Sequence, residues 1–185
     1  MNKKNLILMA SVAVFVILID RITKYIVQTK MVLNQTIHVI GNFFTISYIH
    51  NSGIAFGLLD DKPSPAKAPI LIIASLIALG VILYIYFSLP RKPKIAVIGT
   101  GLVFGGAIGN MVDRIIRGEV IDFFDFDIPD IVIRSLSFRL TRFPTFNVAD
   151  SCVLSGIIIL LILIIRFGVK SDLPNENKTP QEDTG

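Results

Sequence analysis

Two aspartates stand at the ends of long apolar runs and are the residues best placed to do chemistry. Asp113 follows the sequence GNMV at residues 109–112, and Asp150 follows FNVA at residues 146–149. A carboxylate in a membrane helix costs about 2.5–3.5 kcal/mol at mid-bilayer on insertion scales, so such residues mark functional sites. Two of them at one depth suggest acid–base chemistry on a substrate that lies in the membrane.

The composition is typical of an integral membrane protein. The 185 residues are 52% hydrophobic and 17% charged, and the mean hydropathy is +0.69. The net charge of +4 fits contact with lipid head groups, and no nucleic-acid partner is expected because no basic helix carries interleaved aromatic residues. The single cysteine, Cys152, is expected to pack as a small helix residue. His38 and His50 have no motif around them, so we expect no bound metal.

Four apolar segments indicate four transmembrane helices. They cover residues 5–27, 70–89, 95–112 and 146–165, and a spanning helix needs about 20 residues, with a range of roughly 17–25. Asp20 and Arg21 stand where a signal peptide would carry its cleavage site, which favours a retained first helix. The predicted fold class is a membrane all-α protein with a small extracytoplasmic β-sheet.

Basic residues predict the orientation. One side of the membrane receives Lys3, Lys4, Arg91, Lys92, Lys94, Arg166 and Lys170, whereas the lysines and arginines of the other side stand in two longer segments with many acidic residues. Since cytoplasmic loops carry an excess of lysine and arginine, the first side and both termini are predicted to be cytoplasmic. The connection at residues 89–94 is short, so its three basic residues are the strongest evidence for this orientation.

The opposite side receives two longer segments, at residues 31–66 and 115–145. Both are rich in β-branched and aromatic residues, as in TIHVI at 36–40, FFTISYI at 43–49 and VIDFFDFD at 120–127. This pattern predicts short strands in a small sheet on the outer membrane face. Residues 1–170 are predicted to form a single domain and residues 171–185 a disordered cytoplasmic tail. The role of the long stretch 125–142 stays open.

The helix lengths place the two aspartates at similar depth. At 1.5 Å per residue, Asp113 lies about 27 Å beyond Ile95, and Asp150 lies about 24 Å beyond Arg166. The hydrocarbon core is about 30 Å thick, so both carboxylates fall just inside its outer boundary. Glycines at positions 101, 105 and 109 form a stripe that allows close helix packing, which would bring the third and fourth helices together.

Two carboxylates that meet share one proton, which is the chemistry of aspartic peptidases. One of them takes a proton from water, and the other donates to the scissile carbonyl or the leaving amine. The sequence does not assign these roles. The alternative is a structural pair in which each aspartate caps a helix end or binds Arg114 or Lys24.

Two amides accompany the aspartates. Asn110 and Asn147 each stand three residues before an aspartate and therefore share its helix face. They either point into a common pocket or cap helix ends. Asp20 and Lys24 are four residues apart and fit a simple ion pair near the lipid interface.

Five sequence blocks together resemble the lipoprotein signal peptidases (signal peptidase II) of bacteria. They are DRITK at 20–24, NSGIAF at 51–56, GGAIGNMVDR at 105–114, VIDF at 120–123 and FPTFNVADS at 143–151. The resemblance covers nearly the whole chain apart from the tail. It implies four membrane helices, a small outer β-sheet, a place in the bacterial plasma membrane and no cofactor.

The resemblance also implies a reaction. This family cleaves prolipoproteins on the amino side of a diacylglyceryl-modified cysteine, so lipid-modified prolipoproteins and membrane lipids are the expected partners. Asp113 and Asp150 match the catalytic pair. The positions that match pocket residues are Asn51, Asn110, Arg114 and Asn147, and those that match supporting residues are Asp20, Lys24, Gly106, Asp122 and Ala149.

Two other functions use the same features. A small proton- or cation-coupled transporter would use the carboxylates as a relay, although transporter sites usually lie near the midplane on broken helices. A membrane chaperone or assembly factor would need no catalytic carboxylate. The oligomeric state is not determined by the sequence.

Overall fold

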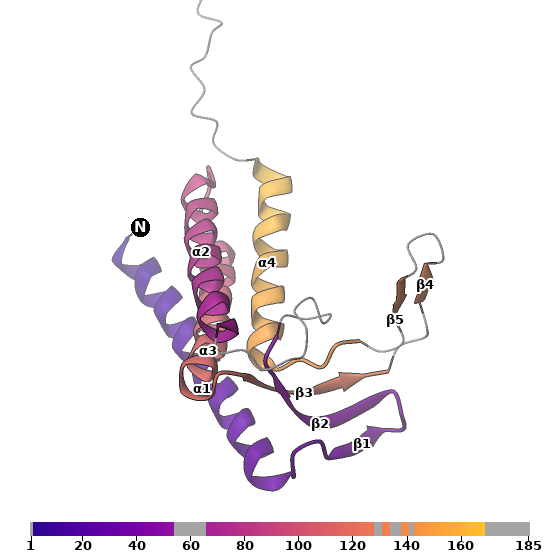
Figure 1. Ribbon diagram of the computed structural model, residues 1–185. Helices are drawn as coiled ribbons and strands as arrows, with labels where there is room; N and C mark the ends of the chain where they lie inside the picture. Colours follow the sequence, from indigo (N-terminus) through magenta and orange to yellow (C-terminus); the bar gives the residue numbers. More distant parts are fainter. Residues whose placement is uncertain (1, 54–65, 128–130, 134–137, 141–142, 169–185) are drawn as a thin grey trace, which may run out of the picture.

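Four long helices dominate the computed structural model, which describes residues 2–53, 66–127, 131–133, 138–140 and 143–168 (Figure 1). They are α1 (Lys3–Lys30), α2 (Lys67–Ser88), α3 (Lys94–Arg117) and α4 (Val148–Phe167). Each has the length and hydropathy of a membrane-spanning helix, which confirms the four predicted spans. The tail predicted to be disordered lies outside the described residues.

Local signals set where the two aspartates fall on their helices. Gly118, in the left-handed conformation at φ 80°, ends α3, so the helix continues a full turn beyond Asp113. Asn147 caps the start of α4, and Asp150 completes a capping box in its first turn. Asp113 therefore lies inside α3, whereas Asp150 lies at the mouth of α4.

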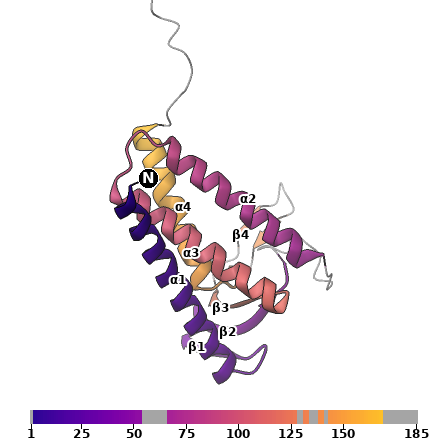
Figure 2. The same cartoon turned by 90° about the vertical axis from the view of Figure 1, so that its left-hand side faces the viewer.

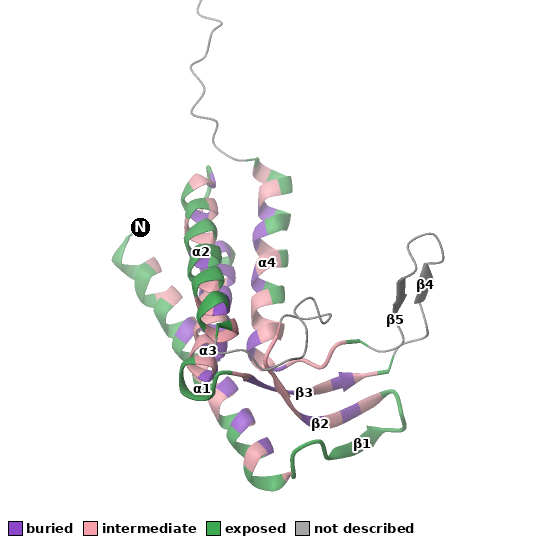
Figure 3. Ribbon diagram, viewed as in Figure 1, coloured by how far each residue is buried: buried purple, intermediate pink, exposed green. Residues whose placement is uncertain are grey.

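Helix α3 is the centre of the bundle. It packs against α1, α2 and α4, and Figure 2 shows it lying between α1 and α2. It is the most buried of the four helices, whereas the outer sides of α1, α2 and α4 are exposed (Figure 3), and many of their exposed residues are large and apolar. Such faces suit contact with lipid.

Glycines on two faces of α3 allow its close packing. Cβ atoms added at Gly101 and Gly105 would lie 2.9 and 2.8 Å from carbonyl oxygens of α1. A Cβ at Gly106 would lie 2.3 Å from the carbonyl oxygen of Ala149 in α4. The predicted stripe of Gly101, Gly105 and Gly109 therefore faces α1. Gly106 lies on a different face of the helix and provides the close approach to α4.

A three-stranded antiparallel sheet closes one end of the bundle. Its order is β1 (Thr36–Ile40), β2 (Phe44–Asn51) and β3 (Val120–Phe126), which confirms the predicted strands. A separate hairpin joins β4 (Ile131–Ile133) to β5 (Phe138–Leu140). Backbone hydrogen bonds of 2.8 and 3.0 Å connect Phe146 with Phe124, so the start of α4 is tied to β3.

The alternation of side chains along β3 directs Asp122 toward the helices. Ile121 and Phe123 are buried with Tyr48 of β2 and Val27 of α1, and this apolar cluster holds the sheet against the bundle. Because successive residues of a strand point to opposite faces, Asp122 points away from the cluster. It is nevertheless only 2% exposed, since α3 and the start of α4 cover that face.

The contact at Gly106 gives a direct test of helix packing. We expect Gly106→Ala to lower the free energy of unfolding by about 1–3 kcal/mol, because the new methyl group meets a backbone carbonyl that cannot turn away. Gly80→Ala is the matched control in α2, where an added Cβ meets no atom within 4 Å. This control should raise stability slightly through helix propensity. Thermal unfolding in detergent measures both, and equal effects would contradict the packing argument.

Candidate active site

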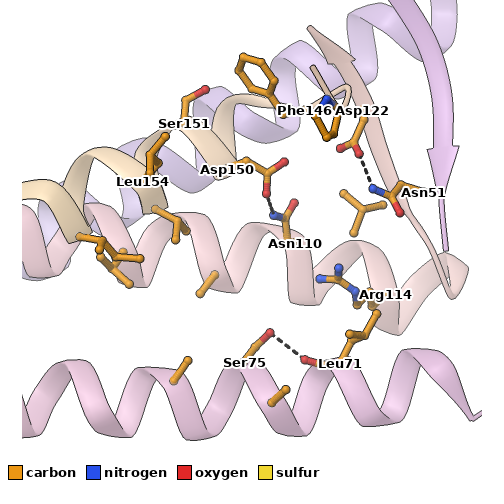
Figure 4. Close-up of a pocket in the computed structure, with 18 of the residues that line it drawn as sticks. Asn51, Leu71, Ser75, Asn110, Arg114, Asp122, Phe146, Asp150, Ser151 and Leu154 are labelled. Carbon is orange, nitrogen blue, oxygen red and sulfur yellow. Dashed lines mark hydrogen bonds between the residues drawn. The ribbon is translucent and has the colours of Figure 1, made fainter. Parts of the chain in front are cut away.

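A cavity of about 1080 Å³ lies between α2, α3 and α4. Its walls are mainly apolar side chains of the three helices. At one end, next to the sheet, Figure 4 shows a group of polar side chains, and five of them line the cavity: Asn51, Asn110, Arg114, Asp122 and Asp150. Four elements, β2, α3, β3 and α4, supply them, so only the folded chain assembles this group.

Both oxygens of the Asp150 carboxylate accept hydrogen bonds. Oδ1 accepts from the amide nitrogen of Asn110 at 2.7 Å, and Oδ2 accepts from the backbone nitrogen of Asn147 at 3.2 Å. In return, the Asp150 backbone donates to the side-chain oxygen of Asn147 at 3.0 Å. Asp150 thus caps α4 and also lines the cavity. Its role as a helix cap does not exclude a role in catalysis.

Asp122 is the second carboxyl group at this end of the cavity. Its Oδ2 accepts from the amide of Asn51 at 2.8 Å, and its Oδ1 accepts from the amide of Asn147 at 2.7 Å. Asn147 therefore contacts Asp122 with its side chain and Asp150 with its backbone. This one residue fixes the two carboxyl groups relative to each other.

The electrostatics of the cavity favour the protonated form of Asp122. Burial, and next the charge of Asp150, raise the pKa of Asp122 to about 7, against the hydrogen bonds from Asn51 and Asn147. The guanidinium of Arg114 interacts with both carboxyl groups and offsets part of their charge. At neutral pH, Asp122 is therefore divided between its protonated and ionised forms.

Asp113 lies on another side of α3. Its carboxylate binds Arg21, Lys24 at 2.7 Å and Arg117 at 2.8 Å, and its side chain is fully buried. Within the described part of the chain, it is not among the residues that line the cavity. These contacts match the alternative in which Asp113 is a structural ion-pair partner. Its predicted catalytic role stays a prediction that its surroundings disfavour.

Helix rotation explains this difference. Val103, Ala107, Asn110 and Arg114 follow one another at intervals of three or four residues and form the cavity face of α3. Asp113 precedes Arg114 and is turned about 100° away from it. We predicted that Asp113 and Asp150 meet because they lie at similar depth in the membrane. Depth does not determine how α3 is rotated about its axis.

The ammonium group of Lys24 connects the two regions. It lies 2.8 Å from Oδ2 of Asp20 and 2.7 Å from Asp113, and it donates to Oδ1 of Asn110 at 3.0 Å. The predicted pairing of Asp20 with Lys24 is present, but both side chains are buried instead of reaching the lipid interface. Asp20 also accepts from the backbone of Ala149 at 3.2 Å and so links α1 to α4.

Lys24 also determines how the amide of Asn110 is oriented. The amide oxygen of Asn110 accepts from Lys24 and, at 3.1 Å, from Asn147. Its nitrogen is then left to donate to Asp150. A cation from α1 therefore fixes the amide group that donates to Asp150.

Several residues of the site were not predicted. Arg21 and Arg117 bind Asp113, and Phe143, Phe146 and Ser75 line the cavity. The sequence could have indicated Arg117, because it stands four residues after Asp113 on the same helix. Phe143 and Phe146 stand in the quoted block FPTFNVADS, shortly before Asn147, whereas Arg21 and Ser75 come from distant segments of the chain.

Comparison with known proteins identifies the family. The model of the signal peptidase (SPase) II family matches residues 12–166. The chain belongs to the signal peptidase II family. The protein is therefore a protease with four membrane-spanning helices.

Relatives and solved structures cover most of the chain. The lipoprotein signal peptidase of Symbiobacterium thermophilum is 38% identical over 84% of this chain and 95% of its own length. That of Staphylococcus aureus is 33% identical over 84% of this chain and 86% of its own length. A bacterial membrane enzyme solved by the in meso method at 2.3 Å resolution matches with a TM-score of 0.68 at 30% identity, covering 94% of this chain and 93% of that one. A second one, solved at 1.9 Å, gives 0.67 at 32% identity, covering 85% and 92%.

The raised pKa of Asp122 predicts a visible titration. The Asp122 carboxyl group should be protonated below about pH 7 and ionised above it. In Asp150→Asn, the pKa of Asp122 should fall. The substitution removes the negative charge of Asp150, which raises the pKa of Asp122 together with burial. Infrared spectroscopy of the protonated carboxyl band against pH, with Asp122→Asn as the reference for assignment, measures both. Full ionisation of Asp122 in the wild-type protein at pH 5 would contradict this account.

Proposed function

We propose that this protein is an aspartic endopeptidase that removes the signal peptide from bacterial prolipoproteins. The cut falls on the amino side of the diacylglyceryl-modified cysteine. One observation carries the proposal: two carboxyl groups, the buried Asp122 and the half-buried Asp150, are held by the same asparagine at the polar end of an otherwise apolar cavity. The relatives in Symbiobacterium thermophilum and Staphylococcus aureus, both lipoprotein signal peptidases, support the same substrate.

Asp122 and Asp150 form the proposed catalytic pair, in place of Asp113 and Asp150. The ionised carboxylate takes a proton from a water molecule, whose oxygen attacks the scissile carbonyl carbon. The protonated partner donates to the carbonyl oxygen, and a proton then passes to the leaving amine as the C–N bond breaks. The pair holds one proton between its members, so acid and base are roles of the pair.

Asparagine side chains hold this pair and leave room for the substrate. Asn51 and Asn110 each donate to one carboxylate and also line the cavity, so they are placed to meet a substrate backbone. Asn147 lies behind the pair and fixes its spacing. Arg114 points into the cavity (Figure 4), where its charge suits a substrate carbonyl that gains negative charge during attack.

The apolar walls of the cavity suit a substrate that stays in the membrane. Leu71, Ala78 and Ile82 of α2 face Leu154 and Ile157 of α4 across it. A signal-peptide helix or the acyl chains of the modified cysteine can occupy such a surface while the scissile bond reaches the polar end. A substrate from the bilayer would approach between α2 and α4.

The proposed location is the bacterial plasma membrane, with the active site near the extracytoplasmic face. The start of α1, the α2–α3 connection and the end of α4 lie at the end of the bundle away from the sheet (Figures 1 and 2). Their lysines and arginines favour the cytoplasmic side for that end. The sheet, the two carboxyl groups and the bound prolipoprotein then face outward, and lipids cover the exposed helix faces.

The experiment that tests the function compares two precursors. The purified protein is mixed with a diacylglyceryl-modified prolipoprotein and, separately, with the same precursor without the lipid. We expect cleavage of the lipidated precursor alone, with the modified cysteine as the new N-terminus by mass spectrometry. A protein that carries protons or cations across vesicles without cutting either precursor would contradict the proposal.

The catalytic pair predicts a contrast among three aspartates. Asp122→Asn and Asp150→Asn should each lower kcat by at least about 10³-fold, since each removes one member of a unit. Asp125→Asn is the matched control on β3, because Asp125 is also buried but binds Thr45 and Ser47. It should keep most of the activity.

Asp113→Asn separates the two candidate pairs. It should lower stability, because it weakens the buried ion pairs with α1. The fraction that stays folded should still cleave the precursor. Loss of cleavage in folded Asp113→Asn protein, together with activity in Asp122→Asn, would favour Asp113 and Asp150 instead. Folded protein is quantified by size-exclusion chromatography before each assay.

A further inference from the structure

A second polar cluster lies beside the active site, at the end of the β2–β3 ladder. His50 Nδ1 is 2.5 Å from Oε1 of Glu119, and His50 Nε2 is 2.9 Å from the hydroxyl of Tyr48. The rings of Tyr48 and His50 meet edge to face, with their centroids 5.2 Å apart. We call these three residues the strand-end clamp. None of them lines the cavity within the described part of the chain.

The clamp and the active site lie on opposite faces of the same two strand ends. Tyr48 and His50 are two residues apart on β2 and share one face of the strand, while Asn51 points to the other. Across the ladder, His50 pairs with Ile121 and Asn51 pairs with Val120. The clamp therefore joins the backbone segments that carry Asn51 and Asp122.

Asn51 needs such a restraint because it is the last paired residue of β2. The ends of strands and loops open more easily than their centres. Yet the amide of Asn51 has to stay 2.8 Å from the Asp122 carboxylate while its oxygen accepts from the backbone of Gly53 at 2.9 Å. The clamp closes the ladder at this point. Tyr48 anchors it, since that ring is buried in the apolar cluster with Val27, Ile121 and Phe123.

We propose that His50 is a positioning residue that acts through Asn51 on the Asp122–Asp150 pair, an inference that rests on the proposed function. Histidine suits this place because its ring links an acceptor to a hydroxyl. Nδ1 carries a proton toward the Glu119 carboxylate, and Nε2 accepts from Tyr48 in the neutral ring. A protonated ring keeps both contacts, with Nε2 as the donor to the Tyr48 oxygen. Partial exposure of His50 and Glu119, at 28% and 32%, leaves the clamp near the surface while its effect reaches the cavity.

The test replaces His50 by phenylalanine, which keeps the ring and removes both nitrogens. We expect kcat for the lipidated precursor to fall by roughly tenfold, because misplacement of a group at the site lowers the rate more than substrate binding. KM should change by less than about twofold. His38→Phe is the matched control, because His38 lies exposed on β1 and contacts Gly41. Glu119→Gln, which keeps the shape of the side chain, should lower kcat in the same direction by a smaller factor.

A double variant shows whether His50 acts through Asn51. If it does, His50→Phe should cause little further loss of kcat in an Asn51→Ala background, because the two residues belong to one unit. Multiplicative losses would overturn the proposal, as would a kcat for His50→Phe equal to that of His38→Phe. Hydrogen exchange of the backbone at residues 50–53 should also be faster in His50→Phe, and unchanged exchange would count against the clamp.

Asp122→Asn in the same assay separates this inference from the proposed function. An active Asp122→Asn variant would remove the proposed catalytic pair and the positioning role with it. An inactive Asp122→Asn variant, with His50→Phe equal to its control, would remove the positioning role alone.

Discussion

The burial of charge inside an apolar bundle is the constraint on which the rest of this structure depends. Lys24 is almost completely buried, and such an ammonium group is tolerated only when carboxylates and hydrogen-bond acceptors surround it. Asp20, Asp113 and Asn110 do so from α1 and α3. Because Asp20 also accepts from the start of α4, one network fixes three helices beside the proposed active site. The glycines of α3 make this possible, since they let the backbones of α1 and α4 come close enough for short side chains to meet.

The same network reaches the proposed chemistry through asparagine side chains. Lys24 orients Asn110, Asn110 donates to Asp150, and Asn147 joins Asp150 to Asp122. Neutral amides suit this task because each offers a donor and an acceptor without adding charge to a site that already holds two carboxyl groups. The arrangement separates two kinds of aspartate. Asp113 is balanced by cations and ties α3 to α1, whereas Asp122 and Asp150 line the cavity and form the proposed catalytic pair.

The sheet completes the site, because Asp122 and Asn51 come from strands and not from membrane helices. Its apolar cluster with α1 keeps β3 in place, and the contact of Phe146 with Phe124 keeps the start of α4 beside it. The proposed site of this membrane protease combines an apolar part, formed by the helices, with a polar part, formed next to the sheet. In the proposed function, the helices supply an apolar surface for a substrate in the bilayer, and the sheet supplies polar groups at the membrane boundary. The strand-end clamp of Tyr48, His50 and Glu119 belongs to this second part.

The sequence by itself determined the four spans and the strands of the sheet, because hydropathy and side-chain alternation are local properties, and its resemblance to a family supplied Asn51, Arg114 and Asp122 as site residues. It also determined the pairing of Asp20 with Lys24, which needs only a spacing of four residues. Only the tertiary structure decided which aspartates face one another. Depth along a helix follows from counting residues, but the rotation of α3 depends on how its glycines pack against α1 and α4. That rotation directs Asp113 to the cations of α1 and Asn110 to the cavity, and it leaves the place opposite Asp150 to Asp122, a residue of a strand.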